Sequence, residues 1–184
     1  MISPEATERA REYFDRTADF DYEDILYRYR SEKSGSEVPA EDVLREMRRW
    51  LALNAANPGA GYVMLGGVDD MWHTFVLFTD QYQRFCEEHF GRFVHHVPNV
   101  PRSEDDEPRV EVQPDGSRHI QFAPDVVAGY RRFVDDYRTV FPDIDLSSDL
   151  WPRILDDGKV TCPTDSCCLS AACYIRGCGP DGPT

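Results

Sequence analysis

The sequence predicts a mainly helical, single-domain bundle with one small β-hairpin and an irregular cysteine-rich C-terminal tail. Apolar residues recur with a 3.6-residue period in several segments, one short region alternates apolar and polar residues around a turn, and five of the six cysteines follow Thr161. A chain of 184 residues is long enough for one well-cored domain and too short for two large ones. We expect the helical domain to span residues 1–157 and the tail to span residues 158–184.

Three scaffold helices are expected in the first third of the chain. Pro4 begins the first helix, Asp21 caps the second, and Pro39 begins the third. In each segment the apolar side chains fall on one stripe, which is the pattern of a helix packed on a core. The sequence Asn-Pro-Gly-Ala-Gly at 57–61 then ends the third helix.

The stretch 68–98 holds four of the five histidines and is the centre of the functional argument. Its apolar period predicts one helix that starts near Asp69 and a second that ends at Gly91, a residue suited to a helix C-terminus. A loop carrying His95 and His96 follows.

The remaining elements are a hairpin and a last helix. Two alternating runs, 109–112 and 117–122, flank the turn sequence Gln-Pro-Asp-Gly, and such a hairpin needs helices to pack on. Pro124 begins a strongly periodic helix. The period fades after Pro142, where Trp151 is expected to anchor a loose segment to the core.

The net charge of the protein limits which partners it can bind. A net charge of −14 disfavours binding to nucleic acid, because binding to phosphates needs a basic surface. The one basic cluster, Arg45, Arg48 and Arg49, is interpreted as a solvated helix face. No apolar run approaches the ~20 residues that span a bilayer, and the N-terminal residues lack the pattern of a signal peptide. We expect a cytoplasmic protein that binds neither membrane nor nucleic acid, with a basic protein surface as its possible partner.

A metal site is the sharpest hypothesis that the residues support. Asp69 and His73 are four residues apart, so a helix projects both from one face. His96, or its neighbour His95, could return from the loop as a third ligand. Two histidines and one carboxylate suit zinc or non-haem iron.

Simpler interpretations stay open for each residue. An acid at position 69 is also what a helix N-cap requires, and His73 could be a half-buried histidine bonded to a carbonyl. Cys86 and His89, together with His95, are possible additional ligands. Cys86 fits a small buried residue equally well, and His89 a surface residue.

The ordered motif of the central stretch resembles the glycine-rich domain-containing protein-like family, which occurs in multidomain plant proteins and short bacterial ones. The residues that carry the resemblance are Val68-Asp69-x-x-Trp72-His73-x-x-x-Leu77, Tyr82-x-x-x-Cys86-Glu87 and Phe90-Gly91-x-Phe93-x-His95-His96-x-Pro98. The resemblance implies importance for Asp69, Trp72, His73, Tyr82, Cys86, Gly91 and His96. Trp72, Tyr82 and Gly91 are expected to be structural. Many members carry a second histidine where this chain has Phe75.

The tail holds a nearly regular cysteine repeat, formed by Cys162, Cys167, Cys168, Cys173 and Cys178. The Cys-x2-Cys knuckles of zinc ribbons are absent from it. Four of these thiolates could hold a soft metal, or the tail could be redox-active, or its thiols could simply be reduced.

Two functional hypotheses follow. The first is a metal-binding protein whose site uses Asp69, His73 and His96; if this protein is an enzyme, the metal would activate water or dioxygen. The second is a non-enzymatic interaction module in which the same residues only close the core. The first requires the two histidines to converge, whereas the second places them apart and bonded to backbone. The sequence has no hydrolase triad order, phosphate-binding loop or dinucleotide fingerprint.

Overall fold

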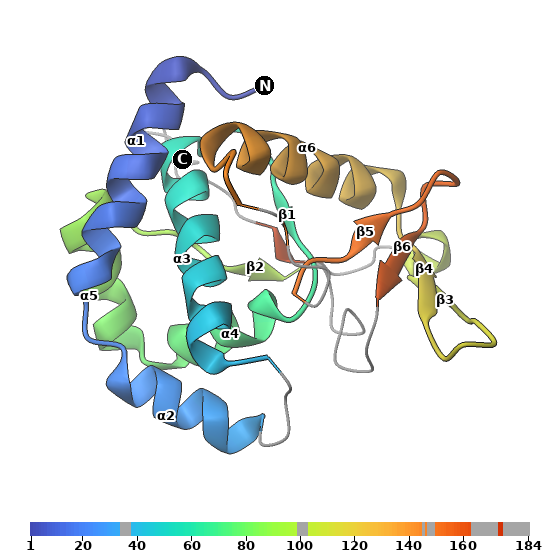
Figure 1. Ribbon diagram of the computed structural model, residues 1–184, viewed down its shortest axis with the longest axis horizontal. Helices are drawn as coiled ribbons and strands as arrows, with labels where there is room; N and C mark the ends of the chain where they lie inside the picture. Colours follow the sequence, from blue (N-terminus) through green and yellow to red (C-terminus); the bar gives the residue numbers. More distant parts are fainter. Residues whose placement is uncertain (34–37, 99–102, 145, 147–149, 163–172, 175–184) are drawn as a thin grey trace.

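A computed structural model describes residues 1–33, 38–98, 103–144, 146, 150–162 and 173–174 (Figure 1). The fold is mainly helical with small antiparallel sheets, which confirms the predicted class. The helices of the described residues are α1 (Pro4–Arg16), α2 (Glu23–Glu32), α3 (Ala40–Ala56), α4 (Val68–Leu77), α5 (Thr79–Phe90) and α6 (Pro124–Val140), with short 3-10 turns at Thr17–Asp19 and Glu104–Asp106.

Helix α3 is the central element. Figure 1 shows it in the middle of the molecule, with α1 alongside it and α6 crossing near the end of both. Its C-terminal half is buried on every side, because the run from Trp50 to Ala56 is apolar except for Asn54. The Asn54 side chain donates to the Trp50 carbonyl at 2.9 Å, so its polarity is satisfied within the helix.

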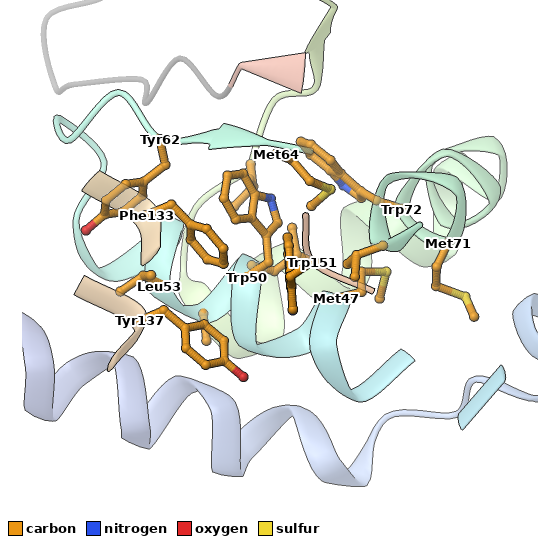
Figure 2. Packing of buried hydrophobic residues seen from close by; sticks show 14 of the residues in the cluster. Met47, Trp50, Leu53, Tyr62, Met64, Met71, Trp72, Phe133, Tyr137 and Trp151 are labelled. Carbon is orange, nitrogen blue, oxygen red and sulfur yellow. The ribbon is translucent and has the colours of Figure 1, made fainter. Parts of the chain in front are cut away.

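Large aromatic rings fill the core between α3 and α6 (Figure 2). The Phe133 ring lies 4.7 Å from both Trp50 and Trp151, measured between ring centroids. Trp151 is 1% exposed, so the segment beyond α6 is pinned to the core as expected. Glycine at 129 lets α6 approach the segment before α4, since a Cβ there would come within 2.6 Å of the Val63 side chain.

The basic cluster of α3 is not a uniform solvated face. Arg45 is exposed, but Arg49 is buried and forms an ion pair with the buried Glu46. The carboxylate of Glu46 also accepts hydrogen bonds from Tyr137 at 2.8 Å and Trp151 at 2.9 Å. The interpretation of Arg49 as a solvated residue was therefore wrong, because α6 and the Trp151 segment cover this side of α3.

The predicted hairpin is present as β3 (Arg109–Val112) and β4 (Arg118–Gln121), paired antiparallel. It continues into a four-stranded sheet of order β3-β4-β6-β5, completed by β6 (Val160–Cys162) and β5 (Arg153–Ile154). A second sheet, of order β1-β7-β2, joins β1 (Val63–Met64), β7 (Cys173–Tyr174) and β2 (Val97–Pro98).

The tail beyond residue 157 enters both sheets where the structure describes it. Strand β6 includes the backbone of Cys162, and β7 includes that of Cys173. Cys167, Cys168 and Cys178 lie outside the described residues, so soft-metal binding by the tail remains a prediction, as does a domain boundary at 157. In the described part of the chain, every helix is too short or too polar to cross a bilayer.

Candidate metal centre

Helix α4 carries the first two candidate ligands. The chain enters this helix through Gly66, whose φ of +100° favours glycine, and a Cβ at this position would come within 2.3 Å of the Leu150 carbonyl oxygen. Gly67 precedes the helix and Asp69 is its second residue. Asp69 therefore does not occupy the N-cap position itself. It lies within the first turn, where a carboxylate complements the helix dipole, and it is 5% exposed.

Helix α5 ends where the loop carrying the third candidate begins. Gly91 adopts the left-handed conformation, with φ of +66°, and turns the chain back. The Tyr82 hydroxyl then donates to the Val94 carbonyl at 2.6 Å and accepts from the Trp72 indole N–H at 3.1 Å. Two buried aromatic side chains thus join α4, α5 and the loop. This arrangement explains why the motif contains Trp72 and Tyr82 at these positions.

The fold brings Asp69, His73 and His96 together. Each offers one ligand atom, and these atoms all lie within 4.8 Å of one another. Nδ1 of His73 is 3.3 Å from Oδ2 of Asp69, as the four-residue spacing predicts. The His96 ring lies 4.4 Å from the His73 ring and 4.5 Å from the Trp72 ring, measured between centroids. The three residues form a cluster of donor atoms whose exposure increases from the buried Asp69 to the exposed His73.

The electrostatics of His96 suit a metal ligand. Burial, followed by the neighbouring His73, lowers the pKa of His96 to about 4, so the ring is neutral near pH 7. Its Nε2 atom is buried and has no hydrogen-bond partner within the described structure. A neutral imidazole with an unused nitrogen is the form that coordinates a metal ion.

The spacing of the donors also sets a geometric requirement. Ligands about 2.0–2.2 Å from a zinc ion stand roughly 3.4 Å from one another in a tetrahedral arrangement. Asp69 and His73 already stand at about this spacing, at 3.3 Å, whereas a donor pair as far apart as 4.8 Å would have to close by about 1.4 Å around such an ion. His73, whose side chain is 44% exposed, has the most room to move.

The other candidate ligands lie outside this group. The Cys86 side chain is fully buried, and burial raises the pKa of its thiol to about 11, which leaves it protonated. The His89 ring is tilted against the Phe85 ring at 5.1 Å between centroids, and burial lowers the pKa of His89. His95, the alternative loop histidine, packs with its ring tilted against Phe93 at 4.8 Å between centroids.

Two neighbours of the site were not anticipated from the sequence. Lys33 at the end of α2 forms an ion pair with Asp70 at 2.8 Å, next to the buried Asp69. Strand β7 pairs with β2, and β2 is the strand that begins directly after His96. A lone lysine and a two-residue strand have no sequence pattern that could have indicated either contact.

A family model described as UCP032817-like matches residues 13–110, which is more than half of the chain and includes all three candidate ligands. The chain belongs to this family. The expected membership in the glycine-rich domain-containing protein-like family is thereby wrong: a thirty-residue motif resembled that family, whereas the matching model extends over α2 to α5. No curated protein and no solved structure matches the chain.

Proposed function

We propose that this member of the UCP032817-like family binds a divalent transition metal, zinc or iron, through Asp69, His73 and His96. The observation that carries the proposal is the convergence of three donor atoms within 4.8 Å, one of them from a loop more than twenty residues beyond the other two. Two imidazoles and one carboxylate form a ligand set used for both metals.

The buried end of the group supports the same proposal. The Asp69 carboxylate is 5% exposed, so it favours positive charge beside it, and a cation between Asp69 and the two imidazoles would add to the favourable effect of the helix N-terminus. His96 would contribute a neutral ring whose orientation is set by packing on Trp72.

The exposed end favours a site with open coordination positions. Three protein ligands leave at least one position of a tetrahedral ion free, and His73 lies toward solvent. A water molecule held there would have a lowered pKa, which is the basis of metal-assisted hydrolysis. We therefore infer that any activity of this chain takes place on the solvent side of His73. The rival interaction module requires the histidines apart, and their convergence favours the metal site.

The experiment is metal analysis of protein purified anaerobically without chelator, combined with cobalt(II) titration followed by d–d absorption. We expect about one equivalent of metal in the wild-type chain. His73→Ala and His96→Ala should each bind cobalt(II) about a hundredfold more weakly. His95→Ala is the matched control, because it removes the adjacent histidine of the same loop, and it should bind like the wild type.

A second variant separates the central site from the tail. Replacing the five cysteines after Thr161 with serine removes every tail thiol and leaves the three ligands intact. Metal retained by this variant and lost in His73→Ala would support the proposal. Metal lost with the thiols, or equal binding by His73→Ala and wild type, would contradict it.

A further inference from the structure

The loop that carries His96 is attached to the rest of the molecule on both sides of this residue. On one side the Val94 carbonyl accepts the hydrogen bond from the buried Tyr82. On the other side β2 begins at Val97, directly after His96, and its pairing partner in the described structure is β7, with Val97 opposite Tyr174 and Pro98 opposite Cys173. A segment far along the chain therefore holds the residue next to a candidate ligand.

Strand β7 in turn is tied to the core. It lies between β2 and β1, and β1 consists of Val63 and Met64, which are both 0% exposed. Val63 packs directly against Gly129 of α6, so β1 cannot shift without disturbing the centre of the fold. Through β7, the backbone next to His96 is thus linked to a rigid part of the molecule.

The backbone chemistry singles out one residue of β7. Proline lacks an N–H group, so Pro98 cannot donate to a neighbouring strand. In an antiparallel pair, opposite residues alternate between exchanging two hydrogen bonds and exchanging none. The pair that can exchange two bonds across β2 and β7 is therefore Val97 with Tyr174.

The third ligand depends most on such support. Asp69 and His73 are fixed relative to each other by one helix, whereas His96 comes from a loop. A loop free to move must lose more conformational entropy when it closes on a metal ion than a loop already held near the bound position.

We propose that the C-terminal strand β7 is a positioning element of the metal centre, with the backbone of Tyr174 holding His96 in place for binding. This inference rests on the proposed function and adds that strand β7, which belongs to the cysteine-rich tail, controls the affinity of the site formed by Asp69, His73 and His96. By linkage, a metal bound at His96 must also stabilise the pairing of β7.

The test compares Tyr174→Pro, which removes the N–H group facing β2, with Tyr174→Val, which keeps it. In cobalt(II) titrations of the full chain, we expect about tenfold weaker binding for the proline variant, the effect of losing one or two backbone hydrogen bonds. The valine variant should bind within about twofold of the wild type. A cobalt(II) absorption spectrum with weak d–d bands and no thiolate-to-cobalt charge-transfer band identifies binding by nitrogen and oxygen ligands rather than by tail cysteines.

Hydrogen exchange provides a second readout that does not depend on the two Tyr174 variants. Adding zinc to the wild-type chain should slow amide exchange in peptides containing residues 173–174, and His73→Ala should abolish the effect. Equal cobalt affinity of the proline variant and the wild type, or unchanged exchange in zinc-loaded protein, would overturn this inference alone. A wild-type chain that binds no metal would overturn the proposed function and this inference with it.

Discussion

The buried ion pair of α3 offers a sharp test of how the core is held together. Glu46 and Arg49 are 7% and 8% exposed, and one carboxylate oxygen of Glu46 accepts from both Tyr137 and Trp151. The perturbation is Glu46→Ala. It leaves a buried guanidinium without its counter-charge and two buried donors without an acceptor.

The magnitude follows from these lost partners. Removing one member of a buried ion pair typically costs about 3–5 kcal/mol of unfolding free energy. Each neutral donor left without a partner costs about 1–3 kcal/mol more, although partial relaxation offsets some of that. We expect Glu46→Ala to lose about 5 kcal/mol, a large fraction of the roughly 5–15 kcal/mol of a typical domain. Glu46→Gln keeps an acceptor but not the charge, and should lose roughly half as much.

The assay is urea unfolding followed by fluorescence and circular dichroism, with the free energy extrapolated to water. Glu41→Ala is the matched control, since Glu41 lies on the same helix and pairs with Arg30 at the surface. This control should lose no more than about 1 kcal/mol. A Glu46→Ala variant that unfolds within 1 kcal/mol of the control would refute the assignment of Glu46 as the acceptor that holds α3, α6 and the Trp151 segment together.

Three further predictions concern the framework of the site. Tyr82→Phe removes the hydrogen bond to the Val94 carbonyl. It should lower the unfolding free energy by about 1–2 kcal/mol and weaken cobalt binding several-fold. Unchanged values in both assays would count against the attachment of the loop by Tyr82. Cys86 should resist iodoacetamide at pH 8, because burial raises the pKa of its thiol to about 11 and only the deprotonated thiol reacts. Rapid labelling of the Cys86 peptide, detected by mass spectrometry, would be inconsistent with this buried environment. Gly66→Ala should lower the unfolding free energy measured in urea by about 2–4 kcal/mol, because residue 66 has a positive φ and a carbonyl oxygen lies close to its Cβ position. Gly59→Ala, with open space at its Cβ, should be nearly neutral in the same urea measurement, and equal effects of the two substitutions would be evidence against strain at residue 66.

Local pattern was sufficient for much of the scaffold. The helices, the hairpin at 109–121 and the break at Gly91 follow from apolar period, turn residues and caps, all of which act over a few residues. The shared face of Asp69 and His73 follows in the same way, because four residues make about one helical turn.

Long-range packing decided the rest. Whether His95 or His96 turns toward α4 depends on how Tyr82 and Trp72 hold the loop, and adjacent residues of a loop carry no period that distinguishes them. The burial of Arg49 depends on α6 lying over α3, which no window of the α3 sequence contains.

By itself, then, the sequence determined the mainly helical class, the hairpin and one pair of candidate ligands, since each depends on contacts between residues close along the chain. The tertiary structure placed His96, the third ligand of the hypothesis, rather than its neighbour His95 in the group, and it alone placed β7 beside β2. The physical reason is that such contacts join segments many residues apart, and they form only when the whole chain has buried its apolar surface.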